Sequence, residues 1–489
     1  MLPPLSYALA KGTLLEVNEG VLRLLLRYPL KTICIHTAWR PVFERLDSAD
    51  PLPFKDLAGL MPDVPSQKIA QFLDQLVHKG FLERSGVDFP QAWRTVSIVI
   101  PVRNRPGEIA DCLDSLQLLD YPDDKIEIIV VDDASDDATP DVVEQYPVQL
   151  IRLDQHRQAS YCRNLGARHA TGEVLAFIDS DCLADPMWLK RLLPAFEDPS
   201  LAAVGGRVDG VFEEKSLDRY EKAKSSLMVS SRAKRSQPDD PFFYVPACNF
   251  LVRREVFLEL GGFNTRLVVG EDVDLCWRLQ KSGHGLEFRP DGTVYHKHRN
   301  DLYSFCRRRF DYGTSEPLLQ KRHPDKIKQF VVPPAAAGFW GCILLWAIVG
   351  LPFFGMAAAL VLVADGFLKW FRFRRQAMSM GLVFSATLRS TAAFFYHLCS
   401  FISRYYLMAG LLMVVLAPTL TLVVVGMHLL VAVVEHRVKK AALGLAAFIL
   451  LFSFEQVAYQ AGVWWGCLRH RIVSPLVPQF LFTSSKRFN

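Results

Sequence analysis

The amino-acid sequence predicts an α/β domain with a mostly parallel sheet, between a small N-terminal module and an apolar helical region. Strand-like runs alternate with helical stretches between residues 95 and 315, which is typical of a parallel sheet covered by helices. The chain then changes character, because residues 331–468 are dominated by Leu, Val, Ala and Phe. We therefore expect three domains, at residues 1–92, 93–330 and 331–489.

The N-terminal module is expected to be winged-helix-like. Apolar residues recur at helical spacing in VLRLLLRYPL (21–30) and in DVPSQKIAQFLDQLVHKGFLERSG (63–86), where Lys79-Gly80 ends the helix. Phe81-Leu82-Glu83 then predicts a short strand. A small helical packing domain is the alternative. The second helix carries mixed charge and the net charge is only +5, which argues against nucleic acid as a partner.

Cysteine usage and the N-terminus favour a cytosolic chain. None of the ten cysteines is spaced as CxxC or grouped as in a zinc site, which is typical of reduced thiols. The first residues, MLPPLSYALAKGTLLE, lack the apolar core of a signal peptide. We therefore expect the first third of the chain to stay in the cytosol.

The apolar region predicts association with the cell membrane. Residues 331–364 contain no Lys, Arg or Glu and could cross a bilayer once, unless Gly350-Leu351-Pro352 turns them into a re-entrant hairpin. Residues 381–404 are typical of an interfacial helix, and 408–434 and 441–467 are further candidate spans. The positive-inside rule favours a catalytic domain that faces the cytosol. A large buried soluble core is the alternative.

Polar residues follow successive predicted strands of the α/β domain. Taken singly, an Asp after a strand is ordinarily a turn or a helix cap. Their order at several strand ends instead predicts a ligand site, because α/β sheets bind ligands beyond the carboxyl ends of their strands. The strands are Val96–Val102, Ile126–Val131, Val148–Leu153 and Val174–Ile178, and the polar residues are Asn104 after Pro101, the group Asp132, Asp133 and Ser135, and the pair Asp179 and Asp181.

Asp179 and Asp181 predict a site for Mg²⁺ or Mn²⁺. Side chains alternate along an extended segment, so both carboxylates point to one side, and hard divalent cations prefer oxygen ligands. His296 is a candidate for completing the metal shell, and a structural histidine is the alternative. Arg163 could donate charge-assisted hydrogen bonds to a diphosphate or nucleoside, or simply form a surface ion pair.

Glu271 and Asp272 open a predicted helix that reads DVDLCWRLQKSG and stops at Gly283. One interpretation is an acidic N-terminus favoured by the helix dipole. The other is a general base, since one carboxylate can deprotonate an attacking hydroxyl.

Residues 97–300, with these motifs in order, resemble the catalytic domain of family 2 glycosyltransferases, which have the GT-A fold and invert the anomeric centre. The resemblance implies that Asp179 and Asp181 bind the metal and the sugar diphosphate. It further implies that Asp272 is the base, with Glu271 orienting the acceptor or sugar. The implied nucleoside-binding residues are Pro101, Asn104, Asp132, Asp133 and Ser135.

The chain departs from the family pattern at three places. The glycine common before the Arg-Asn motif is missing from His156-Arg157-Gln158-Ala159. Arg105 stands where an acidic residue often follows the Asn of the first motif. The tryptophan that processive relatives carry near Arg307–Arg309 is absent from this position, where the sequence reads CRRRFDYG.

The order of the three regions and the C-terminal run AYQAGVWWGCLRHR resemble the family 2 enzymes of mycofactocin systems. That resemblance implies transfer of glucose from UDP-glucose, in β-1,4 linkage, to a peptide-derived redox cofactor, and a PqqD-like N-terminal domain. The alternative enzyme is a membrane glycosyltransferase that builds cell-surface polysaccharide or glycolipid. A catalytically inactive membrane scaffold is a third reading, and the intact Asp179, Asp181 and Asp272 count against it.

Overall fold

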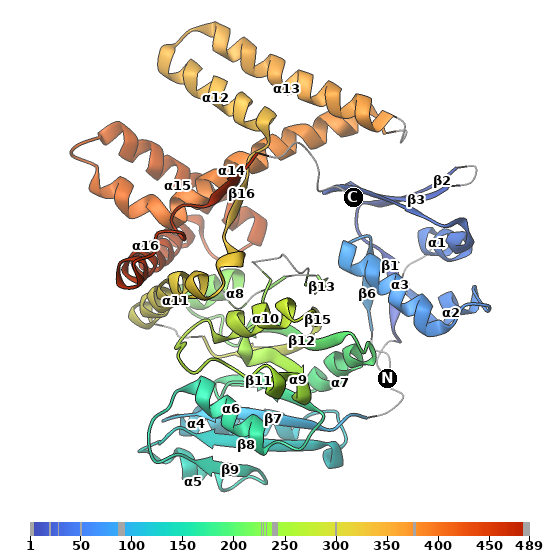
Figure 1. Cartoon of the computed structure of the whole chain (residues 1–489), viewed down its shortest axis with the longest axis vertical. Helices are drawn as coiled ribbons and strands as arrows, with labels where there is room; N and C mark the ends of the chain where they lie inside the picture. The colour runs from blue at the N-terminus through green and yellow to red at the C-terminus, as the bar shows by residue number, and fades with distance from the viewer. Residues whose placement is uncertain are drawn as a thin grey trace. The chain divides into compact units, whose positions relative to one another are not determined.

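The computed structural model describes residues 4–18, 21–27, 29–48, 51–86, 93–225, 227, 229–230, 232–236, 243–298, 301–374 and 378–482. The chain forms two compact units, Met1–Asp301 and Leu302–Asn489. Figure 1 labels many of their helices and strands.

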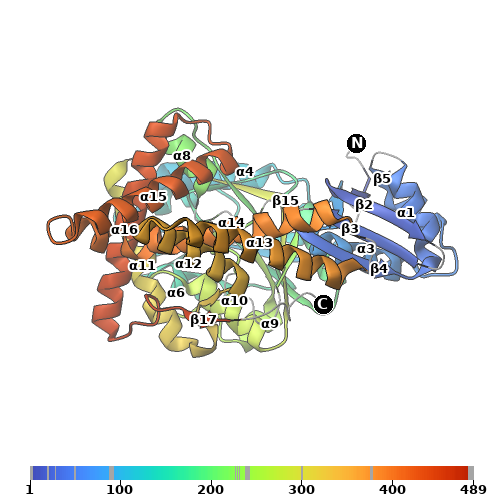
Figure 2. The same ribbon diagram turned by 90° about the horizontal axis from the view of Figure 1, so that it is seen from above.

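The first unit begins with a small domain of two three-stranded sheets around its own hydrophobic core. One sheet has the order β2-β3-β4 and the other β5-β1-β6 (Figure 2), and α3 contacts β6 while α1 contacts β1 and β2. Leu24, Val42 and Leu73 are fully buried in the core they share. The strands are β1 Ser6–Leu9, β2 Thr13–Asn18, β3 Val21–Arg27, β4 Leu30–Ile35, β5 Leu52–Pro53 and β6 Leu82–Ser85, and the helices are η1 Thr37–Trp39, α1 Arg40–Asp47, α2 Phe54–Gly59 and α3 Ser66–Lys79.

The predicted helix at residues 21–30 is wrong, because Val21–Arg27 form β3 and Leu30 begins β4. Leu22, Leu24 and Leu26 are all buried, and β3 pairs with a strand on each side. A short apolar run fits either a buried strand or a helix by periodicity alone, and the pairing decides between them. The predicted helix and strand near residue 80 are confirmed: α3 ends at Gly80, whose φ is +84°, and β6 follows.

The α/β domain is built on a sheet that has nine strands among the described residues. Its order is β11-β15-β12-β14-β10-β7-β8-β9, and β13 pairs with β15. The four predicted strands form β10, β7, β8 and β9, which are mutually parallel as expected. The strands are β7 Val96–Val102, β8 Ile126–Asp132, β9 Gln149–Arg152, β10 Val174–Phe177, β11 Cys182–Ala184, β12 Leu201–Gly210, β13 Lys234–Arg235, β14 Phe250–Arg253 and β15 Gly285–His296.

The sheet as a whole is mixed, so the prediction of a mostly parallel sheet is wrong for its second half. Strand β14 runs antiparallel to both β10 and β12, and β11 runs antiparallel to β15. Strand β14 thus lies between the four parallel strands and the part of the sheet that contains β15, the strand that ends at His296. The helices of this domain are α4 Pro106–Gln117, η2 Asp123–Lys125, α5 Thr139–Val143, α6 Ala159–His169, α7 Trp188–Leu192, η3 Leu193–Glu197, α8 Ser216–Lys224, η4 Ala247–Asn249, α9 Arg254–Glu259 and α10 Glu271–Lys281.

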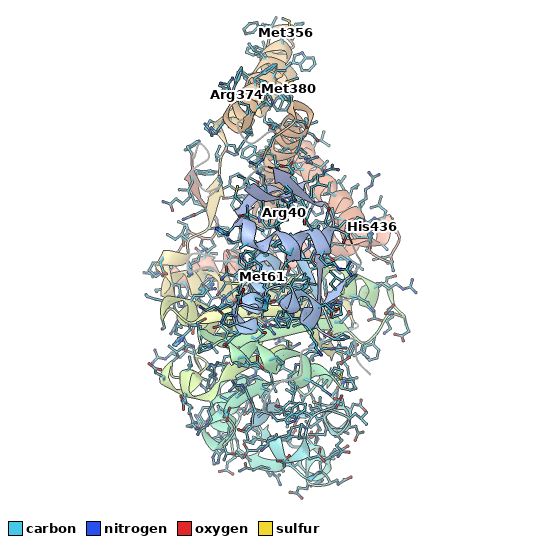
Figure 3. All side chains as sticks on the ribbon, turned by 90° about the vertical axis from the view of Figure 1, so that its right-hand side faces the viewer. Arg40, Met61, Met356, Arg374, Met380 and His436 are labelled. Atoms are coloured by element: carbon cyan, nitrogen blue, oxygen red, sulfur yellow. The ribbon has the colours of Figure 1, made fainter. Side chains whose placement is uncertain are left out.

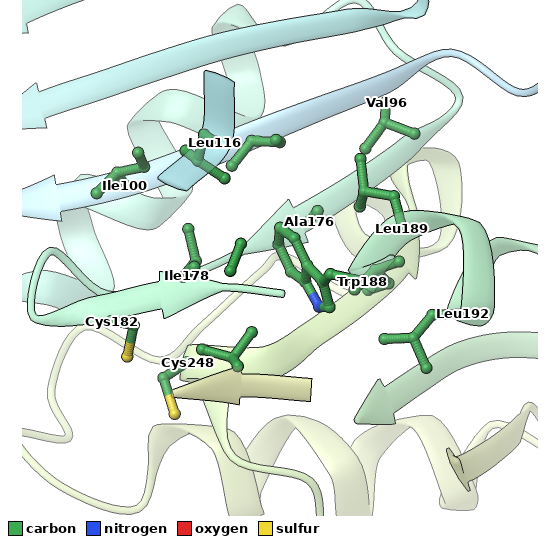
Figure 4. Close-up of a cluster of buried hydrophobic side chains, with 14 of the residues drawn as sticks. Val96, Ile100, Leu116, Ala176, Ile178, Cys182, Trp188, Leu189, Leu192 and Cys248 are labelled. Atoms are coloured by element: carbon green, nitrogen blue, oxygen red, sulfur yellow. The ribbon is translucent and has the colours of Figure 1, made fainter. Parts of the chain in front are cut away.

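Hydrophobic cores cover both faces of this sheet. Ile98 and Ile100 of β7 belong to one core, with α4 and α7, whereas Val99 belongs to the other, with α6, α9 and α10. This alternation follows the period of two along a strand. Figure 4 shows the first core, in which Trp188 is fully buried and donates to Asn249 Oδ1 at 2.8 Å. Both faces are therefore closed to water, and polar groups gather at the strand ends.

The second unit is helical, and three of its described helices are long and apolar enough to cross a membrane by length and composition: α13, α15 and α16. The Glu455 carboxylate of α16 lies 3.8 Å from Arg309 of α11, within this unit. The elements are α11 Leu302–Arg322, η5 Pro324–Lys326, β16 Gln329–Val331, α12 Pro334–Val349, α13 Pro352–Phe373, α14 Met380–Leu412, α15 Pro418–Lys439, α16 Leu445–His470 and β17 Gln479–Leu481.

Close backbone contact joins α11 to α16. A Cβ added to Gly462 would lie 2.0 Å from the carbonyl oxygen of Phe310, and one added to Gly313 would lie 2.2 Å from that of Tyr459. Small residues that let two helix backbones approach are typical of helix pairs in membranes. The glycines of the C-terminal run AYQAGVWWGCLRHR therefore have a packing role.

Candidate active site

The turn after β7 is hydrogen-bonded to the turn after β8. Asn104 has a φ of +49°, a left-handed conformation that asparagine tolerates better than most residues. Its amide nitrogen donates to Ser135 Oγ at 2.9 Å, and its side chain exchanges hydrogen bonds with Asp136 at 2.6 and 3.1 Å. Ser135 in turn donates to the buried Asp132 carboxylate. Pro101 lies in β7 beside Val131, one residue before the strand ends.

Asp133 holds a different segment from its neighbour Asp132. Its carboxylate accepts from the amide nitrogens of Arg157 and Gln158 at 2.6 and 2.9 Å, and lies 2.7 Å from His156 Nδ1. It thereby fixes the approach to α6, where Gln158 has a φ of +73°. The predicted nucleoside-binding residues thus lie together at the carboxyl ends of β7 and β8. Asp133 fixes the backbone of the segment that leads into α6.

Arg163 links two carboxylates of the site, Asp179 after β10 and Glu271 at the start of α10. It is 4% exposed, donates to Asp179 Oδ1 at 2.5 Å through one terminal nitrogen, and donates to Glu271 Oε1 at 2.9 Å through the other. Burial alone would lower the pKa of this guanidinium, but Asp179 and Glu271 hold it above its ordinary value. Arg163 is therefore a permanent cation between the predicted diphosphate site and the predicted base.

Asp181 is paired with Arg105, a contact that sequence reasoning missed. Arg105 donates to Asp181 Oδ2 at 2.5 Å, while Asp181 Oδ1 lies 3.5 Å from His296 Nε2. Burial would raise the pKa of Asp181, but His296 and Arg105 hold it below its usual range. In the sequence, the departure of Arg105 from the family pattern is the one sign that this residue has a role in the site. Its partner, Asp181, is found only in the folded structure.

The donor atoms around Asp181 fit a hard divalent cation. Ligand atoms of Asp181, Cys182 and His296 all lie within 4.8 Å of one another. Burial, and then the neighbouring Cys248, raise the pKa of the Cys182 thiol well above its ordinary value, so it stays protonated and is a poor ligand. Figure 4 shows Cys182 and Cys248 side by side at the rim of the core. A carboxylate oxygen, which suits Mn²⁺ or Mg²⁺, and the imidazole nitrogen of His296 remain.

A second histidine stands behind His296. The Nδ1 atoms of His296 and His298 lie 3.1 Å apart, and His298 Nδ1 lies 3.6 Å from the buried Glu221 carboxylate. Gly210 makes room for this ring, because a Cβ there would lie 3.0 Å from Cδ2 of His298. When Nδ1 of His296 donates to His298, its Nε2 lone pair faces Asp181. Metal-bound histidines are commonly oriented by such a partner.

Asp272, the predicted general base, lies in the first turn of α10. It follows Gly270, whose φ is +84°, at the start of α10, and accepts from the amide nitrogens of Val273 and Ala247 at 2.8 and 3.4 Å. Burial, and then the adjacent Glu271 carboxylate, raise its pKa to about 7. A base is most effective when its pKa lies near the operating pH.

The chain is similar to known glycosyltransferases. A family model described as Glycosyl transferase family 2 matches residues 97–261. The chain is 32% identical over 400 residues to the pre-mycofactocin glycosyltransferase of Mycobacterium tuberculosis (strain H37Rv), covering 79% of this chain and 82% of the relative. It is 30% identical over 211 residues to glycosyltransferase AglE of Haloferax volcanii, covering 42% and 67%. Among solved structures, it aligns with the mannosyltransferase PcManGT from Pyrobaculum calidifontis, in complex with GDP-Man and Mn²⁺, at TM-score 0.37 and 21% identity, covering 62% of this chain and 89% of that chain.

Proposed function

Because the chain belongs to glycosyltransferase family 2 and has a GT-A-like fold, we propose that it transfers a hexose from a nucleotide sugar to an acceptor hydroxyl with inversion. The proposed donor is UDP-glucose, the linkage is β-1,4, and the acceptor is a peptide-derived redox cofactor of the mycofactocin type. The observation that carries this choice is the similarity to a pre-mycofactocin glycosyltransferase over 79% of the chain.

The reaction needs one proton acceptor beside the reacting carbon. The acceptor hydroxyl gives its proton to the Asp272 carboxylate while its oxygen attacks the anomeric carbon. The bond from that carbon to the diphosphate oxygen breaks, and the nucleoside diphosphate leaves with the electron pair. The raised pKa of Asp272 supports this role, and Glu271, held by Arg163, would orient the acceptor or the sugar.

The leaving diphosphate carries negative charge, and two parts of the site would neutralise it. Arg163 supplies a fixed guanidinium beside Asp179. Asp179, Asp181 and His296 would hold Mg²⁺ or Mn²⁺, which supplies a Lewis acid at the phosphate oxygens. Asn104, Asp132, Asp133 and Ser135, at the adjoining strand ends, would contact the nucleoside beside Pro101.

The two flanking regions would have different roles: one would bind the acceptor and the other would associate with the membrane. We expect the winged-helix-like, PqqD-like N-terminal domain to recognise a peptide segment, and α3 of that domain contacts the catalytic sheet through His78 and Glu287 at 3.3 Å. The second unit would associate with the cell membrane while the catalytic domain faces the cytosol. Its three long apolar helices support this, and they also favour the second candidate, transfer to a lipid-linked acceptor.

Product mass spectrometry tests the proposal. The purified full chain is offered UDP-glucose, UDP-galactose and GDP-mannose in turn, each with a mycofactocin-type acceptor or with a polyprenyl phosphate. A gain of hexose mass on the peptide-derived acceptor, lost in Asp272→Asn and retained in the exposed control Asp123→Asn, is the expected result. Transfer to the polyprenyl phosphate alone would establish the second candidate, and transfer to neither would contradict both.

A further inference from the structure

We infer that the α12–α13 hairpin enters one leaflet of an anionic bilayer and returns to the side it came from, without crossing. The inference rests on the proposed membrane association and adds its mode. Helices α12 and α13 are joined by Gly350 and Leu351 alone. Gly350 has a φ of +74°, and its amide donates to the carbonyl of Trp346 at 2.8 Å, so the turn is a closed helix cap.

The end of the hairpin at this turn is apolar and uncovered. Ile348, Phe353 and Met356 are 72%, 65% and 66% exposed in the described part of the second unit. In Figure 3 Met356 lies at one end of the hairpin and Arg374 lies toward the other. Large exposed apolar patches of this kind mark an interaction surface.

The opposite end of the hairpin packs on α14. Trp340 stacks on Phe395 with ring centroids 4.0 Å apart and donates to the carbonyl of Thr391 at 3.0 Å. Phe367 meets Phe384 with ring centroids 5.2 Å apart. The hairpin is thus held by its base and projects its apolar turn away from α14.

Length and charge show how far the hairpin can enter a bilayer. Helix α12 has 16 residues, about 24 Å, which is shorter than the roughly 30 Å hydrocarbon core. No Asp, Glu, Lys, Arg or His occurs between Lys328 and Asp365. From Pro352 to Asp365 the apolar part of α13 rises only about 20 Å. Helix α13 has the length and composition of a span, but the Asp365–Lys369 ion pair interrupts it, and its uncharged part is shorter than the hydrocarbon core. We therefore expect the hairpin to dip and return.

The base of the hairpin is basic, which favours lipid over a second protein as the occupant. Asp365 pairs with Lys369 at 2.6 Å within α13, and exposed Arg372 and Arg374 follow. Asp365 is the one acidic residue between positions 329 and 380. Basic residues beside an apolar insertion bind anionic headgroups. The aromatic Trp370 among them is typical of the interface.

The test places an environment-sensitive fluorescent amino acid at Met356 or, as a matched control, at Arg374 in the full chain. The protein is reconstituted on vesicles of phosphatidylcholine and phosphatidylglycerol. We expect lipids brominated on the acyl chain to quench the probe at 356 and not at 374. Iodide added outside should quench the probe at 374, and iodide trapped inside should quench neither.

Two results would overturn the inference. Quenching of either probe by trapped iodide means that α13 crosses. Failure of bromolipid to quench the 356 probe means that the turn lies in water, if external iodide quenches the probe, or against a second copy, which sedimentation then detects, if iodide does not. Neither quenching result depends on sugar transfer to a soluble acceptor. The proposed function and the proposed membrane insertion can therefore fail independently of each other.

A second variant set tests the lipid chemistry. Arg372→Gln with Arg374→Gln should weaken binding to anionic vesicles by roughly tenfold and leave binding to neutral vesicles unchanged. Phe353→Asp should weaken binding to both, and Leu258→Asp, at an exposed apolar position of α9, should weaken neither. Equal loss for all variants would contradict a specific hairpin contact.

Discussion

Arg105 donates a hydrogen bond to Asp181 at 2.5 Å, so the second carboxylate of the predicted metal pair already carries a cation supplied by the protein. A divalent ion must share Asp181 with this guanidinium or displace it. We therefore expect the occupancy of the metal site to depend on Arg105, in the turn that follows β7.

Removing the Arg105 charge should tighten metal binding in the absence of nucleotide. Because the guanidinium competes for Asp181 at short range, we expect Arg105→Gln to lower the dissociation constant for Mn²⁺ by about tenfold. Electron paramagnetic resonance of free Mn²⁺ during titration measures it. The matched variant Arg103→Gln, at an exposed neighbouring position, should leave the constant unchanged. Weaker binding in Arg105→Gln would contradict competition.

His298 should position His296 for the same ion. His298→Phe keeps a ring in the space above Gly210 and removes the Nδ1 acceptor, so His296 loses its partner. We expect Mn²⁺ affinity to fall by roughly 10- to 100-fold while the unfolding temperature changes little. His169→Phe, at an exposed position at the end of α6, is the control. Unchanged affinity would show that His296 is held in another way or is not a ligand.

Arg163 should be required for both stability and donor binding. Arg163→Met leaves the carboxylates of Asp179 and Glu271 without their shared cation, which typically costs about 3–5 kcal/mol for a buried pair. Urea unfolding and calorimetric titration with UDP measure the two effects. Arg168→Met on the exposed face of the same helix should have neither, and normal UDP binding in Arg163→Met would contradict the proposed role.

Transfer should depend on pH through Asp272. Its pKa of about 7 means that the carboxylate, which is the basic form, predominates above pH 7. We therefore expect kcat/KM to rise tenfold per pH unit well below pH 7 and to level off above it. Glu271→Gln removes the charge that helps raise this pKa, so the midpoint should move to lower pH. A midpoint that stays in place or moves upward would contradict the coupling.

Gly462 should be essential to the packing of α11 on α16. A methyl group there would meet the carbonyl oxygen of Phe310, whereas a Cβ at Gly426 of α15 would meet no atom within 4 Å. We expect Gly462→Ala to lower the unfolding temperature of the full chain in detergent by several degrees, and Gly426→Ala to leave it unchanged or raise it. Equal effects of the two substitutions would contradict the close contact.

The sequence predicted the four parallel strands and the residues at their ends, because both depend on local pattern. It did not predict the direction of β14 or the pairing of β11 with β15, which depend on contacts between distant segments. Residues 21–30 were misread because a short buried strand and an apolar helix share one composition. The partners of Asp181 and Arg163 come from other elements, so no local spacing could reveal them, whereas His298 lies two residues after His296.

Nuclear magnetic resonance of the product, recorded as it forms from UDP-glucose, tests the central claim most directly. The donor carries an α-linked sugar, and attack assisted by the Asp272 carboxylate should give a β-glucoside as the first product, with no reaction in Asp272→Asn. An α-glucoside, or transfer at an undiminished rate in Asp272→Asn, would contradict the account.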